Sequence, residues 1–221
     1  MMKKLDRKQM AARVARDIPE GAYVNLGIGL PTLVADYLPA SKNSGREIIV
    51  HSENGILGVG PKPADGEFDE DLINAGKEPV TLLAGGAYFH HADSFAMIRG
   101  RHLDFAILGA FQVSSRGDLA NWHTGAPDAI PAVGGAMDLA VGAKKVLVMM
   151  EHLTKDGKSK IVGQCSYPLT GARCVDRIYT DLAVIDVKAD GLHVVEAIEG
   201  LSFEELQRLT GVPLKRLATA A

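Results

Sequence analysis

Short apolar runs that end in glycine or in a polar turn recur along this chain of 221 residues. Runs of this kind, with helical segments between them, are typical of strands buried on both faces of a parallel sheet. The glycine or polar residue after each run predicts a sharp turn into the next element. The predicted strands cover residues 22–26, 47–51, 80–84, 105–108 and 146–150.

The helices expected around these strands have recognisable start signals. Asp6 followed by Gln9 is a capping-box pattern, and apolar residues recur behind it at helical spacing as far as Ile18. Pro31 predicts the first turn of a helix that runs to Tyr37, because proline is preorganised for that position. Two further helices are expected over residues 137–141 and 202–209.

The C-terminal part of the chain has a different pattern. Asp190-Gly191 lies between two apolar runs, 182–187 and 192–196, which predicts a β-hairpin. We therefore expect an α/β fold: a mainly parallel sheet with helices on both faces and an antiparallel C-terminal edge hairpin. No linker or tandem repeat interrupts the chain, so we expect a single domain over residues 1–221.

Composition excludes several classes of function. The 24 Lys and Arg residues against 27 Asp and Glu residues leave no positive field for nucleic acid or anionic lipid. No apolar run approaches the roughly 20 residues that span a bilayer. The polar N-terminus lacks the apolar core of a signal peptide, and Cys165 and Cys174 are too few for a disulfide framework. These features predict a cytoplasmic protein that binds neither nucleic acid nor membrane.

Metal and dinucleotide sites are also disfavoured. The chain has 7 histidines, but none has the spacing of a zinc motif, and the adjacent His90 and His91 cannot both face one ion from a strand. The Gly27-Ile28-Gly29 turn lacks the third glycine of a dinucleotide fingerprint. We expect no metal and no permanently bound cofactor.

Glu53 is the strongest candidate for chemistry, because ligands of open α/β sheets bind at the carboxyl ends of the strands. It follows the apolar run 47–51 and precedes Asn54-Gly55, a pair that tolerates left-handed backbone. This arrangement predicts a nucleophile elbow with a carboxylate in place of serine. On spacing alone, an exposed carboxylate in a surface turn is the commoner explanation.

The segment Ser52-Glu53-Asn54-Gly55 followed by Ile56-Leu57-Gly58 resembles the active-site segment of the B subunits of class I 3-oxoacid CoA-transferases. Other blocks resemble the same family in the same order, so the resemblance covers nearly the whole chain. Residues 90–94 and 122–134 resemble the 3-oxoadipate branch more than the acetoacetate branch, and the loop from Ala40 to Arg46 is longer than the family pattern. The further matching blocks are 23–32, 71–77, 92–100, 117–122 and 134–139.

The resemblance implies ping-pong transfer of CoA from succinyl-CoA through a glutamyl-CoA thioester on Glu53. Its anionic intermediates need N–H donors in a dry pocket, and three glycine pairs are candidates: Gly27 and Gly29, Gly85 and Gly86, and Gly134 and Gly135. Each pair is, taken alone, more often a plain turn. Substrate or CoA contacts are expected from Asn25, Asn54, Gly55, Lys77, His90, His91 and His123, the histidines facing a distal carboxylate.

The same resemblance implies a partner, the A subunit, in a complex of two A and two B chains, with CoA thioesters as substrates. Three alternatives stay open. The acceptor acid is acetoacetate in place of 3-oxoadipate, or the chain is a sugar-phosphate isomerase or aminosugar deaminase, since one α/β fold hosts many activities. In the third, it is a non-catalytic subunit that only holds an acyl-CoA.

Overall fold

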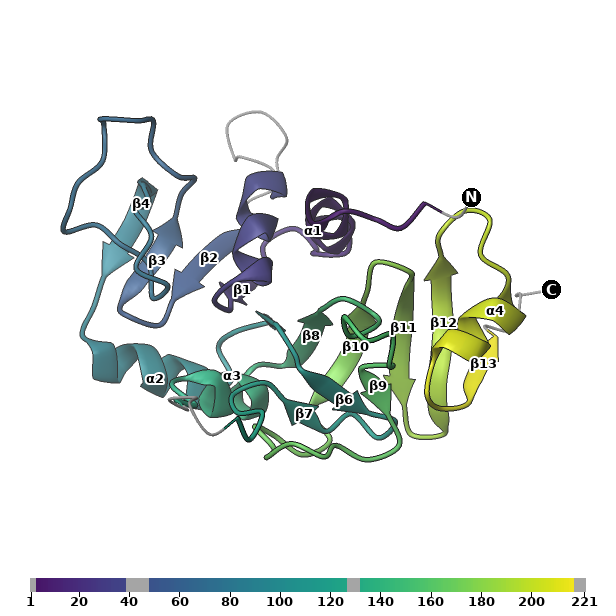
Figure 1. The fold of residues 1–221 in the computed structure, drawn as a ribbon. Coiled ribbons are helices and arrows are strands. Elements are labelled where there is room, and N and C mark those ends of the chain that lie inside the picture. Colours follow the sequence, from purple (N-terminus) through teal and green to yellow (C-terminus); the bar gives the residue numbers. More distant parts are fainter. Residues whose placement is uncertain (1–2, 39–47, 127–131, 217–221) are drawn as a thin grey trace.

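The architecture is described from a computed structural model that covers residues 3–38, 48–126 and 132–216. The lengthened loop at Ala40 to Arg46 lies outside these residues. Within them, ten strands form one sheet in the order β13-β12-β11-β10-β8-β5-β1-β2-β3-β4 (Figure 1). The strands are β1 (Tyr23–Leu26), β2 (Ile49–Ser52), β3 (Ile56–Val59), β4 (Leu82–Tyr88), β5 (Phe105–Leu108), β8 (Lys145–Met149), β10 (Val175–Tyr179), β11 (Ala183–Lys188), β12 (Gly191–Ala197) and β13 (Leu214–Arg216).

The centre of this sheet is parallel and its two ends are antiparallel. Strands β2, β1, β5 and β8 run parallel, as expected from their apolar runs, and β10, which was not predicted, pairs parallel to β8. The predicted hairpin is present as β11 and β12, but it is not the sheet edge, because β13 pairs parallel to β12 outside it. At the other end β3 and β4 pair antiparallel beyond β2. The strand predicted over residues 80–84 is therefore present as β4, but it is antiparallel and continues through Gly85 and Gly86, and β3 was not predicted.

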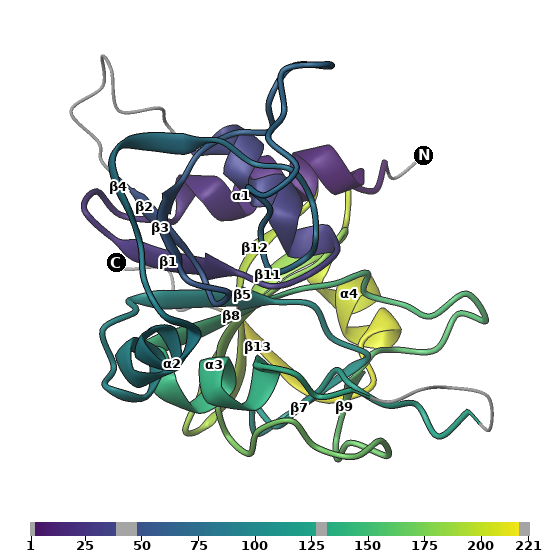
Figure 2. The same cartoon turned by 90° about the vertical axis from the view of Figure 1, so that its left-hand side faces the viewer.

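Helices cover both faces of the sheet, as expected (Figure 2). One face carries α1 (Arg7–Arg16) and η1 (Leu30–Tyr37), and the other carries α2 (His91–Arg99) and α3 (Ala136–Gly142). A small sheet of β7 (Leu119–Ala120), β6 (Gln112–Ser114) and β9 (Ile161–Val162) extends the second layer. Helix α4 (Phe203–Leu209) lies beside β12 and β13 (Figure 1).

Alternation along the strands explains how one sheet serves two cores. Ile107, Leu147 and Met149 face the core beneath α1. Their neighbours Leu108 and Val148 face the core beneath α2 and α3. Because successive side chains of a strand point to opposite faces, a continuous apolar run fills both layers at once.

The predicted local signals at helix ends are present. The side chains of Asp6 and Gln9 form the reciprocal capping box of α1, and the Ser202 hydroxyl accepts from the Glu205 N–H at the start of α4. The helix predicted from Pro31 to Tyr37 is a 3₁₀ helix. Among the described residues, no helix is both long and apolar enough to cross a membrane.

Candidate functional site

Glu53 lies in a tight turn, Glu53-Asn54-Gly55, that joins β2 to β3. The turn closes with a bond of 3.0 Å from the Gly55 N–H to the Ser52 carbonyl. Gly55 has a φ of 118°, and a Cβ there would lie 2.3 Å from the Phe89 carbonyl oxygen, so only glycine fits. The sharp turn predicted after this strand is present. A nucleophile elbow leads from a strand into a helix, however, whereas here the chain continues into the antiparallel strand β3.

The Glu53 carboxylate is half-buried and held by another side chain. Asn25 Nδ2 donates to Glu53 Oε2 over 2.9 Å, and Asn25 itself is fully buried. Residue Asn25 pairs with His51 in the parallel register of β1 and β2, two residues before Glu53. The sheet register thus brings the amide to the carboxylate, and the exposed-turn explanation for Glu53 does not hold.

Glu53 faces a cavity of about 730 Å³ at the carboxyl ends of β1, β5 and β8. Parallel strands place their carboxyl ends at one edge, which is where ligands of such sheets bind. Much of the wall is apolar. It includes Ile28, Leu108, Ala110, Phe111, Trp122, Leu139, Met149 and Met150.

Gly134 and Gly135 are the glycine pair that the structure brings to Glu53. Both line its cavity, and a Cβ on Gly135 would lie 3.7 Å from Glu53 Cγ and 3.0 Å from Phe95 Cζ. A side chain at Gly135 would therefore fill the space beside the carboxylate. This pair stays a candidate for backbone donors.

The other two glycine pairs have other placements. Gly27 lines the cavity, but its N–H already donates to the Ile107 carbonyl over 2.8 Å, so it is not a free donor. Gly29 precedes η1, with a φ of 90°. Gly85 and Gly86 lie inside β4 and not in a turn after a strand.

The position of Gly86 has a packing reason. A Cβ built on Gly58 of β3 would lie 2.9 Å from Gly86 Cα. Glycine at these positions lets the two strands approach closely, a common use of glycine inside a strand. Gly86 is thus needed for the close contact between β3 and β4, and not for binding a ligand as the sequence suggested.

The remaining expected contacts lie around the site and have local partners. The Asn54 side chain donates to the Ile73 carbonyl, and Lys77 is exposed in a left-handed turn with a φ of 64°. His90 caps α2 by accepting from the Ala92 N–H. None of these residues lines the cavity that holds Glu53.

His91 and His123 pack against aromatic rings. The His91 ring lies 4.8 Å from Phe95, and the His123 ring lies 5.4 Å from Trp122, measured between centroids. Neither histidine lines the cavity that holds Glu53, although Trp122 beside His123 does. The predicted carboxylate contact of the histidines therefore stays a prediction, best placed for His123.

Two polar residues near Glu53 were not predicted, His51 and Ser94. His51 Nδ1 lies 3.2 Å from Asn25 Nδ2, and its Nε2 lies 2.9 Å from Ser94 Oγ. Burial lowers the pKa of His51 to about 4, so its imidazole is neutral near pH 7. The available signal was a histidine inside a buried strand, two residues before the candidate nucleophile.

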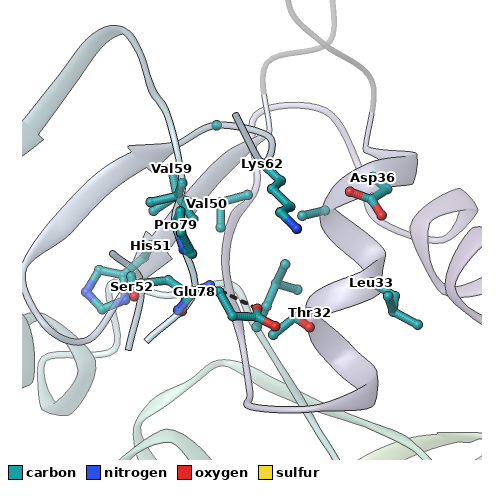
Figure 3. Close-up of a pocket in the computed structure, with 15 residues that line it drawn as sticks. Thr32, Leu33, Asp36, Val50, His51, Ser52, Val59, Lys62, Glu78 and Pro79 are labelled. Carbon is teal, nitrogen blue, oxygen red and sulfur yellow. Dashed lines mark hydrogen bonds between the residues drawn. The ribbon is translucent and has the colours of Figure 1, made fainter. Parts of the chain in front are cut away.

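A second hollow of about 340 Å³ lies on the opposite face of β2, beneath η1 (Figure 3). Val50, Ser52 and Val59 line it, and Figure 3 shows Lys62 and Glu78 beside them. The Ser52 hydroxyl accepts from the Ala75 N–H over 2.9 Å, which ties the loop after β3 to the Glu53 turn. The two cavities thus flank the end of β2.

Charge around the Glu53 cavity is mixed. Arg7 and Glu151 lie 3.9 Å apart, and burial lowers the pKa of Lys160.

Burial raises the pKa of Cys165 to about 11 and that of Cys174 to about 12, so neither is a thiolate near neutral pH. In the described ranges, no three His, Cys, Asp or Glu side chains gather as a metal ion would require.

Comparison with known proteins gives a family and a fold. The family model described as "Coenzyme A transferase" matches residues 7–208. The chain is 68% identical over 211 residues to the B subunit of 3-oxoadipate CoA-transferase from Acinetobacter baylyi, covering 96% of this chain and 95% of that protein. It is 50% identical over 204 residues to the B subunit of succinyl-CoA:3-ketoacid coenzyme A transferase from Helicobacter pylori, covering 92% and 96%.

Among solved structures, the fold matches an acyl-CoA transferase of Escherichia coli O157:H7 with a TM-score of 0.75 at 20% identity. The match covers 96% of this chain but 43% of that one, so this chain spans less than half the length of the E. coli protein. At this identity the likeness concerns the fold alone.

Proposed function

The chain belongs to the coenzyme A transferase family, and from that premise we propose that it is the B subunit of a succinyl-CoA:3-oxoacid CoA-transferase with Glu53 as its nucleophile. One observation carries the proposal: the Glu53 carboxylate, held by buried Asn25, faces a large cavity at the carboxyl ends of the parallel strands. Family membership leaves the sugar-phosphate isomerase and deaminase alternatives without support.

The proposed reaction begins with attack of the Glu53 carboxylate on the thioester carbonyl of succinyl-CoA. The C–S bond breaks, which gives a succinyl-glutamyl anhydride and the CoA thiolate. The thiolate then attacks the glutamyl carbonyl, so that succinate leaves and a glutamyl-CoA thioester remains. The carboxylate of the acceptor reverses both steps, and no oxidant or reductant is consumed.

Each step passes through an anionic tetrahedral centre that needs donors in place before the reaction. Asn25 Nδ2 already donates to Glu53 Oε2, and Gly134 and Gly135 lie beside the same side chain. We assign the amide of Asn25 and the backbone of this glycine pair to that task. Loss of one such donor in serine hydrolases costs roughly 10²- to 10³-fold in rate.

A covalent thioester also needs exclusion of water, because hydrolysis would waste the activation. Ile28 lines the Glu53 cavity and is 68% exposed, and Phe111 on the same wall is 40% exposed. An apolar rim that stays open to solvent favours cover by another chain. Since the relatives are named as B subunits, we propose an A subunit as that cover, in a complex of two A and two B chains.

The acceptor that we favour is 3-oxoadipate, because the relatives named for that acid are 68% identical to the chain while those named for 3-ketoacids are 50% identical or less. Initial rates of the A–B complex with 3-oxoadipate and with acetoacetate test this choice. A preference for acetoacetate replaces it with the alternative acceptor.

The covalent mechanism is tested by incubating the complex with succinyl-CoA and no acceptor, followed by peptide mass spectrometry. We expect CoA attached to Glu53. Glu53→Gln should abolish both the adduct and the transfer, while Glu199→Gln, a change of an exposed carboxylate far along the chain, should keep both. Transfer by the wild type without an adduct contradicts the covalent route, and transfer by Glu53→Gln supports a non-catalytic subunit.

A further inference from the structure

A row of three buried polar side chains lies behind Glu53. Asn25 comes from β1, His51 from the adjacent β2, and Ser94 from α2, which packs over this face of the sheet. Their side chains are almost without solvent contact: Asn25 and Ser94 are 0% exposed and His51 is 1% exposed. Most buried polar groups in proteins are hydrogen-bonded, so the pairing within this row is informative.

The direction of each hydrogen bond in this row follows from the chemistry of the groups. An amide nitrogen only donates, and three acceptors lie within reach of the two N–H groups of Asn25 Nδ2: Glu53 Oε2 at 2.9 Å, and His51 Nδ1 and the His51 carbonyl oxygen at 3.2 Å each. One N–H points to Glu53, and the two His51 acceptors share the other. Because Nδ1 accepts, the imidazole proton is on Nε2, which donates to Ser94 Oγ over 2.9 Å. This tautomer of His51 suits both of its neighbours, the Asn25 amide nitrogen and the Ser94 hydroxyl.

The opposite orientation of the Asn25 amide is strongly disfavoured. With the amide turned over, Oδ1 would face three acceptors: Glu53 Oε2, His51 Nδ1 and the His51 carbonyl. In the observed orientation, Asn25 Oδ1 is buried with no hydrogen-bond partner among the described residues. Its orientation is therefore set by what Nδ2 donates to and not by a partner of Oδ1.

The imidazole is itself held on several sides. Its ring stacks on Phe89 with centroids 5.9 Å apart and planes 18° apart, while Ser94 holds the Nε2 side. Burial keeps the ring neutral near pH 7, as its low pKa shows. A charged imidazole would carry a proton on Nδ1 and would repel the Nδ2 donor of Asn25.

We propose that His51, held by Ser94, is a positioning residue of the transferase reaction: its Nδ1 orients the Asn25 amide so that Nδ2 donates to Glu53. His51 touches no reacting atom in this proposal and acts through Asn25. The inference rests on the proposed role of Glu53 as nucleophile. Throughout the proposed cycle Oε2 stays an acceptor, as carboxylate, anhydride or thioester oxygen, so one fixed donor serves every step.

Three substitutions at His51 separate positioning from simple packing. His51→Leu removes both nitrogens. His51→Asn places an amide oxygen near the position of Nδ1, toward Asn25, whereas His51→Gln extends its amide toward Ser94 instead. The A–B complex of each variant is assayed for kcat, KM for succinyl-CoA and the rate of adduct formation on Glu53.

We expect His51→Leu to lower kcat by about 10- to 100-fold, the loss typical of a misplaced hydrogen bond to a charged group. KM for succinyl-CoA should change by less than about threefold, since His51 does not contact the substrate. His51→Asn should recover most of the lost kcat and His51→Gln should recover less. Ser94→Ala, a milder change, should lower kcat by about fivefold because the ring loses its Nε2 partner.

His152→Leu is the matched control, because it removes a buried histidine with two hydrogen-bond partners outside this row. It should lower stability while the kcat of the folded complex stays at the wild-type value. Wild-type kcat in folded His51→Leu overturns the proposal, and so does equal loss in His51→Leu and His51→Asn. Absence of the adduct in the wild type instead refutes the proposed function of Glu53, which separates the two failures.

Discussion

Two histidines in this chain, His51 and His152, are equally buried but belong to different hydrogen-bond networks. His51 and His152 are 1% and 0% exposed, and burial lowers the pKa of each to about 4. The imidazole of His152 lies between two hydroxyls, with Nδ1 3.0 Å from Thr180 Oγ1 and Nε2 2.9 Å from Thr210 Oγ1. The row of His51 continues through Asn25 to a carboxylate at a cavity.

The hydrogen bonds of His152 close on the protein itself. Thr210 Oγ1 also donates to the Leu206 carbonyl of α4, and Thr180 Oγ1 accepts from the Leu182 and Ala183 N–H groups at the start of β11. This network joins α4 to the sheet. Burial and a shifted pKa therefore do not by themselves mark a functional histidine, and the group at the end of its network does.

Among the substitutions that test this comparison, Asn25→Asp should cause the largest loss of transfer activity. The substitution replaces the donor to Glu53 with a second carboxylate at a fully buried position. We expect transfer to fall by about 100-fold or more, since a donor to a charged group is lost and like charges meet. Initial rates per folded complex, with folding checked by circular dichroism, measure it; retention of more than a tenth of the activity contradicts the assignment of Asn25.

Acid should destabilise both networks alike, because the shifted pKa values have the same sign. Each histidine is neutral in the folded chain down to about pH 4 but gains a proton below about pH 6.5 when unfolded. The unfolded state then binds more protons, so stability falls as pH falls through this window. When the pH falls from 7 to 5, each of the two histidines should lower the free energy of unfolding by about 2 kcal/mol.

Urea denaturation at several pH values measures this loss. His51→Asn and His152→Asn should each remove about half of the histidine-dependent part of the slope between pH 7 and pH 5. A slope unchanged in both variants would show that other groups control the acid sensitivity.

Thr210→Val should have the smallest effect on transfer and separates the two networks most directly. The valine keeps the shape of the side chain but leaves His152 Nε2 without its partner. We expect a loss of about 1–3 kcal/mol of stability and unchanged transfer by the folded complex. A drop in kcat comparable to that of His51→Leu would mean that the C-terminal network also supports the active site.

Much of the local structure was predictable from the sequence. The capping box at Asp6, the helix cap at Ser202 and the hairpin at Asp190-Gly191 depend on residues a few positions apart, so their signals are complete within a short segment. Glu53 was identified by a family-like segment around a strand end. The strand through Gly85 and Gly86 was misplaced because glycine signals a turn in sequence but a close strand contact in this fold.

The sequence by itself determined the α/β class, the family to which the chain belongs, and Glu53 as the candidate nucleophile. Only the tertiary structure decided that Asn25 and His51 meet beside Glu53, that Gly134 and Gly135 are the glycine pair at the cavity, and that β13 forms the outer edge. The physical reason is range. Caps and turns are set by neighbours along the chain, whereas sheet order and register arise from pairing between segments far apart, which no local pattern encodes.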